Sequence, residues 1–378
     1  AIVSRELGIP CVVGARKATR VLKNGKEITV DCTSGQGRIF KGRIPFETKR
    51  YDLEKIPQLK TKIMLNIGSP ESAFRYSFLP VDGVGLARME FILAEKIRVH
   101  PLALIHYAWL KQKARRDAKL KEIIRKIDAI TLGYRTKRDY FVKELAEGIS
   151  QISAAFYPKP VIVRFSAFKT NEYRRLIGGE LFEPEESNPM LGWRGASRYC
   201  TPEYQPAFVM ECEAIKRARD VFGLKNIWTM IPFCRTIEEG KRVLQIMEEN
   251  GLKKGREGLK VIVMCEIPSN VILADRFLEI FDGFSIGSND LTQLVLARDR
   301  DSAIVAKIGD ERNEAVKEMI KRAIRACRKA KKYSGICGEA PSNFPEFAEF
   351  LIKEKIESMS LSPGAVIKTI INISKKNA

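Results

Sequence analysis

The sequence predicts an α/β protein whose main part is a closed (β/α)8 barrel of the TIM type. From about Lys60 onward, short apolar runs rich in Val and Ile alternate with longer segments of helical periodicity. Strands that are apolar on both faces are typical of a parallel sheet covered by helices. About eight such runs in more than 300 residues favour a closed barrel. An open doubly wound sheet is the alternative, although no G-x-G-x-x-G follows a predicted strand.

The eight apolar runs predict the barrel strands in chain order. Amphipathic helices are predicted between several of them, at RTIEEGKRVLQIMEEN and NEAVKEMIKRAIRACRKA. The long interval between Phe168 and Asn226 leaves one alternative open, a short fourth strand over residues 194–199. The last apolar run would then be an addition to the barrel. The runs are KIMLNIG, DGVGLA, PVIVRFSAF, NIWTMIPF, KVIVMCEIP, DGFSIGSND, YSGICGE and ESMSLSP.

A small separate unit is predicted for residues 1–42, ahead of a linker over residues 43–59. The runs CVVGA, KEITVDCT and GRIFKGRI are short, strand-like and punctuated by glycines. The dipeptide Asn24-Gly25 predicts a hairpin turn. The linker stretch is polar, carries two prolines and has no periodicity. The barrel is therefore assigned to residues 60–378.

Composition is that of an ordinary globular protein, with 45% hydrophobic and 30% charged residues. No apolar run approaches the roughly 20 residues of a membrane span. The start lacks the features of a signal peptide, so we expect a cytoplasmic protein without a membrane partner. It also lacks an initiator Met, which indicates a fragment. None of the eight cysteines has C-x-x-C spacing, so neither a zinc site nor a disulfide framework is expected.

A formal net charge of +20, from 66 Lys and Arg against 46 Asp and Glu, raises the alternative of a nucleic-acid-binding module. The densest stretch, residues 111–138, holds eleven basic and three acidic residues. Its apolar residues, among them Leu120, Ile124 and Ile127, have helical spacing, which predicts an amphipathic helix with a basic outer face. Few aromatic residues and no nucleic-acid motif make this function the weaker hypothesis. Anionic small substrates explain positive charge equally well.

Polar residues cluster where the predicted strands end, and this end of a barrel carries the active site. Three arginines at one mouth suit a substrate with a carboxylate and a phosphate, because guanidinium groups bind both bidentately. Two carboxylates on neighbouring strands suit Mg²⁺, which takes its other ligands from water and substrate. The strand-end residues are Asn66, Arg88, Glu90, Arg164, Ser166, Lys169, Arg194, Glu266, Asn289, Asp290, Cys337 and Glu339.

Each of these residues also has a purely structural interpretation. A single arginine at a strand end is more often an ion-pair partner than a ligand. Cys337 alone is more often a packing residue, although a thiol at the mouth could move a proton. Glu266 is harder to explain by structure, because a carboxylate after an apolar strand needs a cation or a partner. The two histidines, His100 and His106, lie on the predicted helix after the second strand. We interpret both as structural, with His106 on a partly buried face.

Seven stretches together resemble the PEP-utilising enzymes, and the resemblance covers essentially the whole chain. This family includes phosphoenolpyruvate synthases, pyruvate phosphate dikinases and a phosphotransferase of sugar uptake. The segments FKTNEY, RGASRY and IRVHPLAL are similar to the synthase branch, whereas CGEAPSN differs from the CGEHGG-like segment of the dikinases, which remain the alternative. The stretches are VGLARMEF, RFSAFKTNEYRRLIGGE, NPMLGWRGASRY, MIPFCRT, VMCEIPSN, DGFSIGSNDLTQL and GICGEAPSN.

The opening AIVSRELGIPCVVG resembles the phosphohistidine segment of the family, with the histidine two positions ahead of Ala1. The resemblance implies that residues 1–42 are the C-terminal part of a swivelling phosphohistidine domain. It also implies that this domain's histidine and an ATP-binding region are partners from outside the chain. The implied reaction passes a phosphoryl group from ATP to the histidine and then to Mg-bound pyruvate enolate. Its products are phosphoenolpyruvate, AMP and phosphate. Family members usually form homo-oligomers.

Carried over by position, the resemblance implies that Arg88, Arg164 and Arg194 hold the substrate carboxylate and the transferring phosphoryl group. Arg88 and Arg164 would also take part in catalysis. Glu266 and Asp290 would ligate the Mg²⁺ cofactor.

The remaining implied roles fall on two segments after the last strands. Asn289, with Gly287 and Ser288 ahead of it, would bind the phosphoryl group or the enolate end of the substrate. Cys337 would move the proton at the methyl carbon, with a thiol pKa lowered by nearby arginines and Mg²⁺. Glu339 would lie near Cys337 and orient it.

Overall fold

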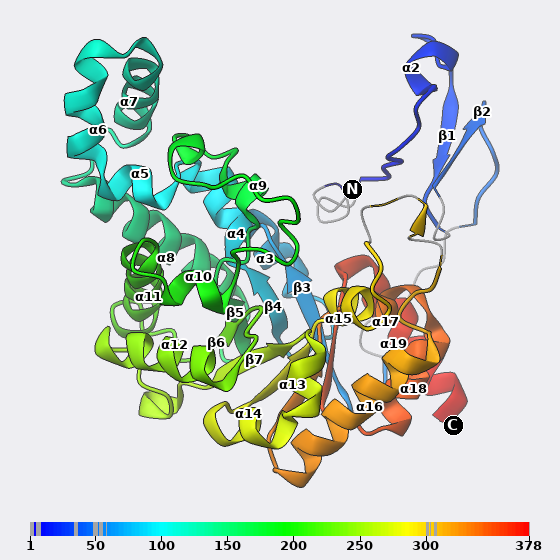
Figure 1. The fold of residues 1–378 in the computed structure, drawn as a ribbon. Coiled ribbons are helices and arrows are strands. Elements are labelled where there is room, and N and C mark those ends of the chain that lie inside the picture. Colours follow the sequence, from blue (N-terminus) through cyan, green and yellow to red (C-terminus); the bar gives the residue numbers. More distant parts are fainter. Residues whose placement is uncertain are drawn as a thin grey trace.

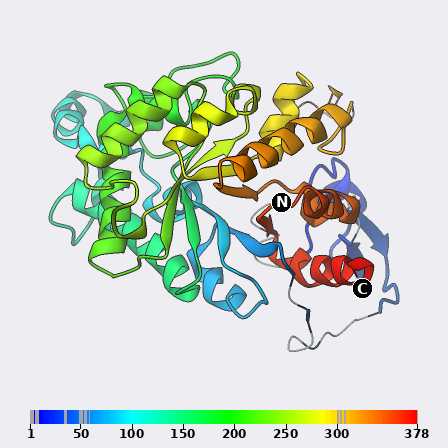
Figure 2. The same ribbon diagram turned by 90° about the horizontal axis from the view of Figure 1, so that it is seen from below.

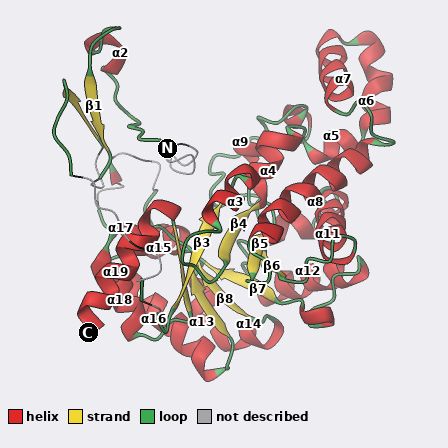
Figure 3. Cartoon of the chain, turned by 180° about the vertical axis from the view of Figure 1, so that it is seen from behind, coloured by secondary structure: helices red, strands yellow, loops and turns green. Residues whose placement is uncertain are grey.

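The chain forms a closed parallel barrel of eight strands in the order β10-β3-β4-β5-β6-β7-β8-β9 (Figure 1). The strands lie at the centre and the helices around them (Figures 2 and 3). The predicted barrel is therefore confirmed, and the open sheet is wrong. The structure is a computed structural model, and it describes residues 4, 9–33, 37–47, 52, 56–57, 59–299, 302, 304–305 and 308–377.

All eight apolar runs form barrel strands, because each is buried on both faces and cannot remain in contact with water. The last run closes the barrel by pairing with β3 on one side and β9 on the other. The alternative fourth strand is wrong, since Ala196–Cys200 forms helix α10. The strands are β3 (Lys62–Ile67), β4 (Val84–Arg88), β5 (Val161–Arg164), β6 (Ile227–Ile231), β7 (Val261–Cys265), β8 (Gly283–Ile286), β9 (Tyr333–Ile336) and β10 (Ser358–Leu361).

The barrel interior is filled by side chains and is not a pore. A cluster inside it includes Leu86, Ile162, Met230 and Ile262, all at most 2% exposed. Small residues let neighbouring strands approach: a Cβ at Gly85 would lie 1.7 Å from Ser360 Oγ.

The helices cover the barrel with apolar faces of helical period, and both predicted helices are confirmed as α12 and α16. They are α3 (Pro70–Tyr76), α4 (Met89–Ile92), α5 (Pro101–Ile105), α6 (Tyr107–Lys113), α7 (Ala118–Ile130), α8 (Lys137–Ala155), α9 (Thr170–Tyr173), α10, α11 (Gln205–Asp220), α12 (Ile237–Glu249), α13 (Pro268–Ile272), α14 (Ala274–Ile280), α15 (Ser288–Val295), α16 (Glu314–Lys329), α17 (Ala340–Asn343), α18 (Pro345–Lys353) and α19 (Val366–Asn377).

The basic stretch runs from the end of α6 through α7 to the start of α8, and the pair α6 and α7 projects from one side of the barrel (Figure 1). The predicted amphipathic helix is confirmed for α7, in which Leu120, Ile124 and Ile127 are buried. It does not extend over the whole stretch, since Asp117 caps α7 by accepting from the N–H groups of Lys119 and Leu120.

The N-terminal unit contains helix α2 (Ala18–Val21) and an antiparallel pair, β1 (Ile28–Asp31) and β2 (Arg38–Lys41). The hairpin turn predicted at Asn24-Gly25 is wrong. This turn links α2 to β1, because the residues before it are helical, and the run CVVGA forms no strand. Half of the opening segment, with its phosphohistidine-like sequence, lies outside the described residues, as do parts of the predicted linker.

All eight cysteines are free, and five of them are buried. Buried thiols of this kind commonly pack as small core residues. Within the described ranges, no helix is both long and apolar enough to cross a membrane.

Candidate active site

The carboxyl ends of the barrel strands carry most of the predicted site residues. Arg88 and Arg164 are the last residues of β4 and β5, and Glu266 directly follows β7. Gly287 follows β8 and precedes α15, while Cys337 follows β9. Parallel strands bring these ends to one mouth, as expected for a barrel.

Arg164 is held by acidic and polarisable groups. Its Nη2 is hydrogen-bonded to Glu90 Oε1, and its Nη1 lies 3.5 Å from Met264 Sδ. Burial alone lowers the pKa of Arg164, but the charges of Glu90, Glu266 and Cys337 raise it above its ordinary value. The guanidinium of Arg164 therefore stays charged beside Glu266 and Cys337, which belong to the same predicted site.

Arg194 comes from the long loop before α10 and not from a strand end. Its Nη2 lies 3.6 Å from Asp290 Oδ2, and its guanidinium carbon lies 4.3 Å from the centre of the Phe233 ring. Both charged side chains are buried. The structure thus brings a predicted substrate arginine to a predicted metal carboxylate.

Glu266 is 1% exposed and is the most constrained carboxylate at the mouth. Its Oε1 accepts the Phe233 N–H at 2.7 Å, whereas Oε2 has no hydrogen-bond partner in the described part of the chain. Burial and the charge of Asp290 raise the pKa of Glu266 to about 7, against the opposing effect of Arg194 and Arg164. Ionisation of both Glu266 and Asp290 is therefore costly unless a cation binds between the two carboxylates.

These features fit Mg²⁺. A cation between Glu266 and Asp290 would satisfy the bare Oε2 atom and cancel the repulsion between the carboxylates. A Cβ at Gly287 would lie 2.8 Å from that same Oε2, so only glycine leaves room beside it. No group of three or more His, Cys, Asp or Glu residues forms a metal site within the described ranges. The protein would therefore supply two ligands, as Mg²⁺ sites with water and substrate ligands do.

A second set of contacts joins the ends of β4, β8 and β9. Arg88 Nη2 lies 3.9 Å from Glu339 Oε1, and Glu339 donates its N–H to Asn289 Oδ1 at 3.2 Å. Glu339 Oε2 accepts from Ser362 Oγ at 3.1 Å. Glu339 therefore contacts Arg88, Asn289 and Ser362, and the orienting role that we expected for it beside Cys337 stays a prediction.

Cys337 is 4% exposed, and its Sγ lies 3.7 Å from the Ile286 carbonyl oxygen. Asn66 fixes the adjacent backbone by donating to the Cys337 carbonyl oxygen at 3.2 Å. Burial raises the pKa of the thiol, although Arg164 and Arg88 act in the opposite direction. The expected lowering of this pKa is therefore absent from the protein alone, because burial outweighs the arginines.

Ser288 is fully buried at the start of α15, and its Oγ has no hydrogen-bond partner among the described residues. A Cβ at Gly338 would lie 1.7 Å from this oxygen. The absence of a side chain at Gly338 thus leaves room for a polar group next to Asn289.

Two other strand-end residues make hydrogen bonds to neighbouring glutamates. Ser166 is buried behind the mouth, where its backbone N–H and its hydroxyl both bind the Glu211 carboxylate. Its hydroxyl also lies 2.5 Å from the Tyr173 hydroxyl. Lys169 begins helix α9, and its N–H donates to Glu172 Oε2 at 2.8 Å.

Glu211 gives a pH-dependent contribution to stability. Burial raises its pKa to about 7, although hydrogen bonds from Ser166 favour the charged form. The folded state therefore holds this proton more tightly than the unfolded state, and stability falls as pH rises from about 4.5 to 7. Over this pH range, we expect Glu211→Gln to reduce the loss in the free energy of unfolding by up to about 3 kcal/mol. Thermal unfolding at pH 5 and pH 8 measures it, with exposed Glu203→Gln as the control; equal slopes in all three proteins would contradict the assignment.

A buried ion pair ties the loop of Arg194 to the rest of the barrel. Arg198 is fully buried and binds both oxygens of Glu183, at 2.6 and 2.7 Å. It also donates to the Trp193 carbonyl oxygen at 3.0 and 3.1 Å, next to Arg194. His100 Nε2 lies 2.9 Å from Glu183 Oε1.

Both histidines keep a structural interpretation, with one correction. His100 is buried and begins α5, with its Nδ1 accepting from the Leu102 N–H at 3.2 Å. Burial lowers the pKa of His100, so the ring is neutral and its Nε2–H donates to Glu183. His106 is exposed and not partly buried as predicted, because it lies between α5 and α6, where it stacks on Phe182.

Loss of the buried ion pair should be costly. Arg198→Met would leave the Glu183 carboxylate buried without its cation, and we expect a loss of about 3–5 kcal/mol in the free energy of unfolding. Urea denaturation measures this value. Arg138→Met is the matched control, because Arg138 also binds both oxygens of a glutamate, Glu213, but at the surface, where about 1 kcal/mol or less is expected. Similar losses in both variants would contradict the expectation.

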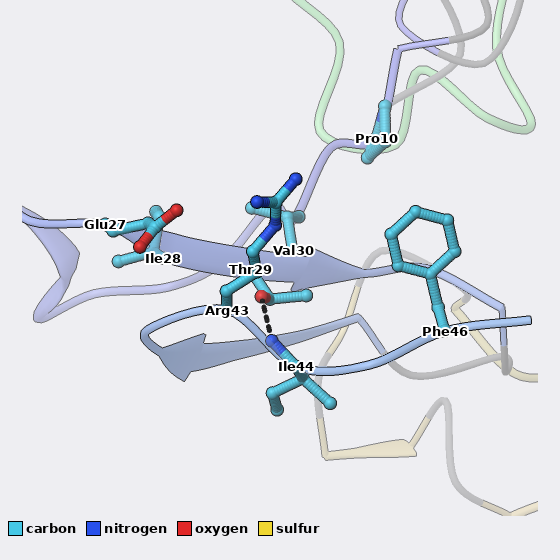
Figure 4. A pocket seen from close by; sticks show the side chains of 8 residues that line it. All are labelled: Pro10, Glu27, Ile28, Thr29, Val30, Arg43, Ile44 and Phe46. Atoms are coloured by element: carbon cyan, nitrogen blue, oxygen red, sulfur yellow. Dashed lines mark hydrogen bonds between the residues drawn. The ribbon is translucent and has the colours of Figure 1, made fainter.

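Two surface pockets lie away from the strand ends. One, of about 420 Å³, is lined by residues of the N-terminal unit and of the segment that follows it, where Thr29 Oγ1 accepts the Ile44 N–H at 3.0 Å (Figure 4). The other, of about 560 Å³, is lined by His106, Phe182, Trp193 and neighbouring residues. None of the predicted site residues lines either pocket.

Part of the charge of the basic stretch is neutralised within the chain. Lys119 pairs with Glu180 at 2.6 Å, and Lys137 pairs with Asp128 at 2.8 Å. Exposed pairs of this kind are typical of a solvated surface. Nucleic-acid binding stays a prediction that a steep salt dependence of RNA or DNA retention would support.

Two residues that hold Glu266 were missed by the sequence analysis. Phe233 binds it through the backbone, and Asn270 Oδ1 accepts the Glu266 N–H at 3.2 Å. The apolar MIPF segment gave no signal for Phe233, since its contribution is a backbone N–H. Asn270 lies within the VMCEIPSN stretch, and its distance of four residues from Glu266 was the available signal.

The comparisons with known proteins show the family to which the chain is similar. Residues 47–378 match the profile of the PEP-utilising enzyme, PEP-binding domain, and residues 1–35 match that of the PEP-utilising enzyme, mobile domain. Phosphoenolpyruvate synthases of Aquifex aeolicus, Synechocystis and Escherichia coli are 54%, 51% and 48% identical over 99% of this chain, which covers 48%, 45% and 46% of theirs. The domain boundaries drawn from the sequence stay predictions.

A solved structure of Haloferax volcanii malate synthase in a ternary complex with pyruvate and acetyl-CoA matches 86% of this chain and 71% of that chain, with 15% identity and a TM-score of 0.43. An HpcH/HpaI aldolase of Desulfitobacterium hafniense matches with 12% identity, a TM-score of 0.39, and coverage of 84% and 92%. These likenesses are too distant to bear on function. The chain spans about half the length of the curated relatives it matches, and it belongs to the PEP-utilising enzyme family.

Proposed function

We propose that this chain binds pyruvate and phosphoenolpyruvate on Mg²⁺ and is the acceptor site of a phosphotransferase. The complete reaction would convert ATP, pyruvate and water to AMP, phosphoenolpyruvate and phosphate through a phosphohistidine. The observation that carries the proposal is the buried pair Glu266 and Asp290. The Oε2 atom of Glu266 has no hydrogen-bond partner in the described part of the chain, and the charges of Arg164 and Arg194 act on this carboxylate.

The charges of these residues suit an anionic substrate. When bound, Mg²⁺ would neutralise negative charge that develops on substrate oxygens. Arg164 and Arg194 each face a carboxylate of the protein, Glu90 and Asp290 respectively, in a mostly buried setting. Each guanidinium has donors to spare, and both have a buried Nε without a hydrogen-bond partner in the described part of the chain. Such donors would bind the carboxylate of the substrate and the phosphoryl group in transfer.

The proton balance assigns a role to Cys337. Conversion of pyruvate to its enolate breaks a C–H bond at the methyl carbon, and a base must take the proton. The Cys337 thiolate would take it, with Arg164 and Arg88 lowering the cost of the charged form. In the reverse direction the thiol returns the proton to the same carbon. The buried position of Cys337 excludes water that would compete for this proton.

A dikinase that uses phosphate as a second acceptor is the alternative within the family. The similarity to the phosphoenolpyruvate synthases, and the GICGEAPSN segment after β9, favour the synthase reaction. In a complete protein, pyruvate-dependent ATP consumption that releases phosphate would support the synthase. Consumption that requires phosphate would support the dikinase.

Calorimetry of this chain with oxalate, a planar mimic of the pyruvate enolate, tests the proposal. Oxalate should bind in the presence of Mg²⁺ and bind far more weakly without it. Acetate in place of oxalate, at the same Mg²⁺ concentration, is the control that separates a chelating site from simple anion binding. Oxalate binding that is equal with and without Mg²⁺, or absent in both conditions, would count against the proposed site.

A further inference from the structure

Phe233 has an unusual backbone conformation at the barrel mouth. It lies two residues after β6 and has a φ of +47°, in the left-handed region that favours glycine. A bulky residue persists there only where its surroundings hold it, and such residues gather at functional sites. Phe233 is also 2% exposed, so the surrounding contacts are those of a packed interior.

The backbone of Phe233 fixes one carboxylate of the proposed metal pair. Its N–H donates to Glu266 Oε1 at 2.7 Å. This bond uses one oxygen of the carboxylate, and Oε2 has no hydrogen-bond partner among the residues that the structure describes. The conformation of Phe233 therefore decides which oxygen of Glu266 is available to a cation.

The ring of Phe233 contacts the arginine that faces the other carboxylate. The guanidinium carbon of Arg194 lies 4.3 Å from the ring centre, and that of Arg235 lies 4.7 Å from it. Contacts this short are within the range of cation–π interactions. Arg235 also donates to the Gly192 carbonyl oxygen at 2.6 Å and to Ser197 Oγ at 2.8 Å, so it ties the ring to the loop that carries Arg194.

A close backbone approach locks this arrangement. The Ala196 N–H donates to the Pro232 carbonyl oxygen at 3.1 Å. Gly195 has a φ of +60°, and a Cβ there would lie 2.4 Å from the Pro232 oxygen and 2.7 Å from Phe233 Cβ. The loop of Arg194 and the loop of Phe233 therefore fit together only with glycine at this position.

We propose that Phe233 is a positioning residue that sets Glu266 and Arg194 relative to each other. Its backbone would fix the carboxylate that takes the cation, and its ring would fix the guanidinium that takes the substrate anion. The inference rests on the proposed function of the site. It makes a separable claim, since the side chain of Phe233 serves the anion and its N–H serves the cation.

The test compares Phe233→Leu with Phe233→Tyr by calorimetry of this chain with oxalate at saturating Mg²⁺. Leu keeps an apolar side chain but loses the π face, so the dissociation constant of oxalate should rise about 3- to 30-fold. Tyr keeps the ring and should remain within about two-fold of the wild type. The affinity for Mn²⁺ alone, followed by its EPR signal, should stay within about two-fold in both variants because the N–H remains.

Phe222→Leu is the matched control. Phe222 is 42% exposed, and the Arg217 guanidinium carbon lies 5.6 Å from its ring centre. This Phe–Arg contact lies outside the proposed site, so its loss should change neither oxalate nor Mn²⁺ binding. Phe233→Gly is a second variant in case Leu does not fold, because glycine accepts the positive φ, keeps the N–H and also removes the ring.

The outcomes separate the two proposals. Oxalate binding by Phe233→Leu or Phe233→Gly that equals the wild type overturns the inference and leaves the proposed function standing. A parallel loss of Mn²⁺ and oxalate affinity that Tyr does not restore also overturns it, since that pattern marks general damage to the fold. A wild-type chain that binds no oxalate with Mg²⁺ overturns both proposals.

Discussion

Replacement of Glu266 by Gln is expected to weaken Mg²⁺-dependent oxalate binding by about 100- to 1000-fold, because it removes one of two charged ligands from a buried site. Gln has the same shape, and its Oε1 atom can still accept the Phe233 N–H. The loss would therefore report the charge and not a change in packing. Calorimetric titration of the variant with oxalate at several Mg²⁺ concentrations measures the effect.

The same variant should be more stable than the wild type in the absence of metal. Burial and Asp290 raise the pKa of Glu266 to about 7, so the folded state holds its proton more tightly than the unfolded state. Stability then falls as pH rises from about 4.5 through 7. We expect Glu266→Gln to have the higher melting temperature at pH 8, and the difference to shrink toward pH 5.

Exposed Glu279→Gln is the control for both measurements, since it removes the same charge from a surface helix. Its oxalate affinity and melting temperature should match those of the wild type at each pH. Wild-type affinity in Glu266→Gln would show that the metal site lies elsewhere. A melting temperature at pH 8 below that of the wild type would contradict the cost assigned to the buried charge.

The barrel could be predicted from the sequence because its strands are apolar on both faces. KVIVMC and PVIVRF stand out from their surroundings, and the segments between strands have helical period. The closing strand was harder to assign, since Ser358 and Ser360 make ESMSLSP less apolar although both serines are buried. Both serines are small enough to pack against the neighbouring strands. The need for small residues at these positions depends on the register in which the strands pair.

The candidate site could be predicted where the barrel itself fixes the geometry. Glu266 and Cys337 directly follow strands, so their position along the chain places them at the mouth. Arg194 comes from a loop, and the geometry of a barrel does not place such a residue. The sequence groups Arg194 with the strand-end residues, whereas the structure brings it to Asp290 from the loop before α10.

Other parts of the site depend on contacts that no local pattern encodes. The role proposed for Phe233 depends on its backbone dihedral angle and on two arginines that contact its ring. Arg194 is distant from it in sequence, and Arg235 is close to it. The Asn24-Gly25 turn was predicted correctly as a turn but assigned to the wrong pair of elements, because the preceding residues form α2. Local chemistry fixed the bend, and longer-range pairing decided what it connects.

Replacement of Cys337 by Ala is expected to slow the exchange of the methyl protons of pyruvate with solvent by about 100- to 10,000-fold, the range typical of a lost general base. Deuterium uptake from D₂O in the presence of Mg²⁺, followed by NMR, measures the rate. Oxalate affinity should stay within about two-fold, because the thiol does not hold the carboxylates of the substrate. A variant that exchanges as fast as the wild type would remove Cys337 from the mechanism.

The pH dependence of this exchange separates a base from a packing residue. Burial raises the pKa of the thiol in the protein alone, and Arg164 and Arg88 oppose that shift. The thiolate is the reactive form, so the wild-type rate should rise with pH until the thiol is ionised, whereas the residual rate of Cys337→Ala should lack this step. Cys327→Ala is the matched control, since Cys327 is equally buried but lies on α16. If the exchange rate of Cys327→Ala also failed to rise with pH, the pH dependence would come from a change in the fold and not from ionisation of the Cys337 thiol.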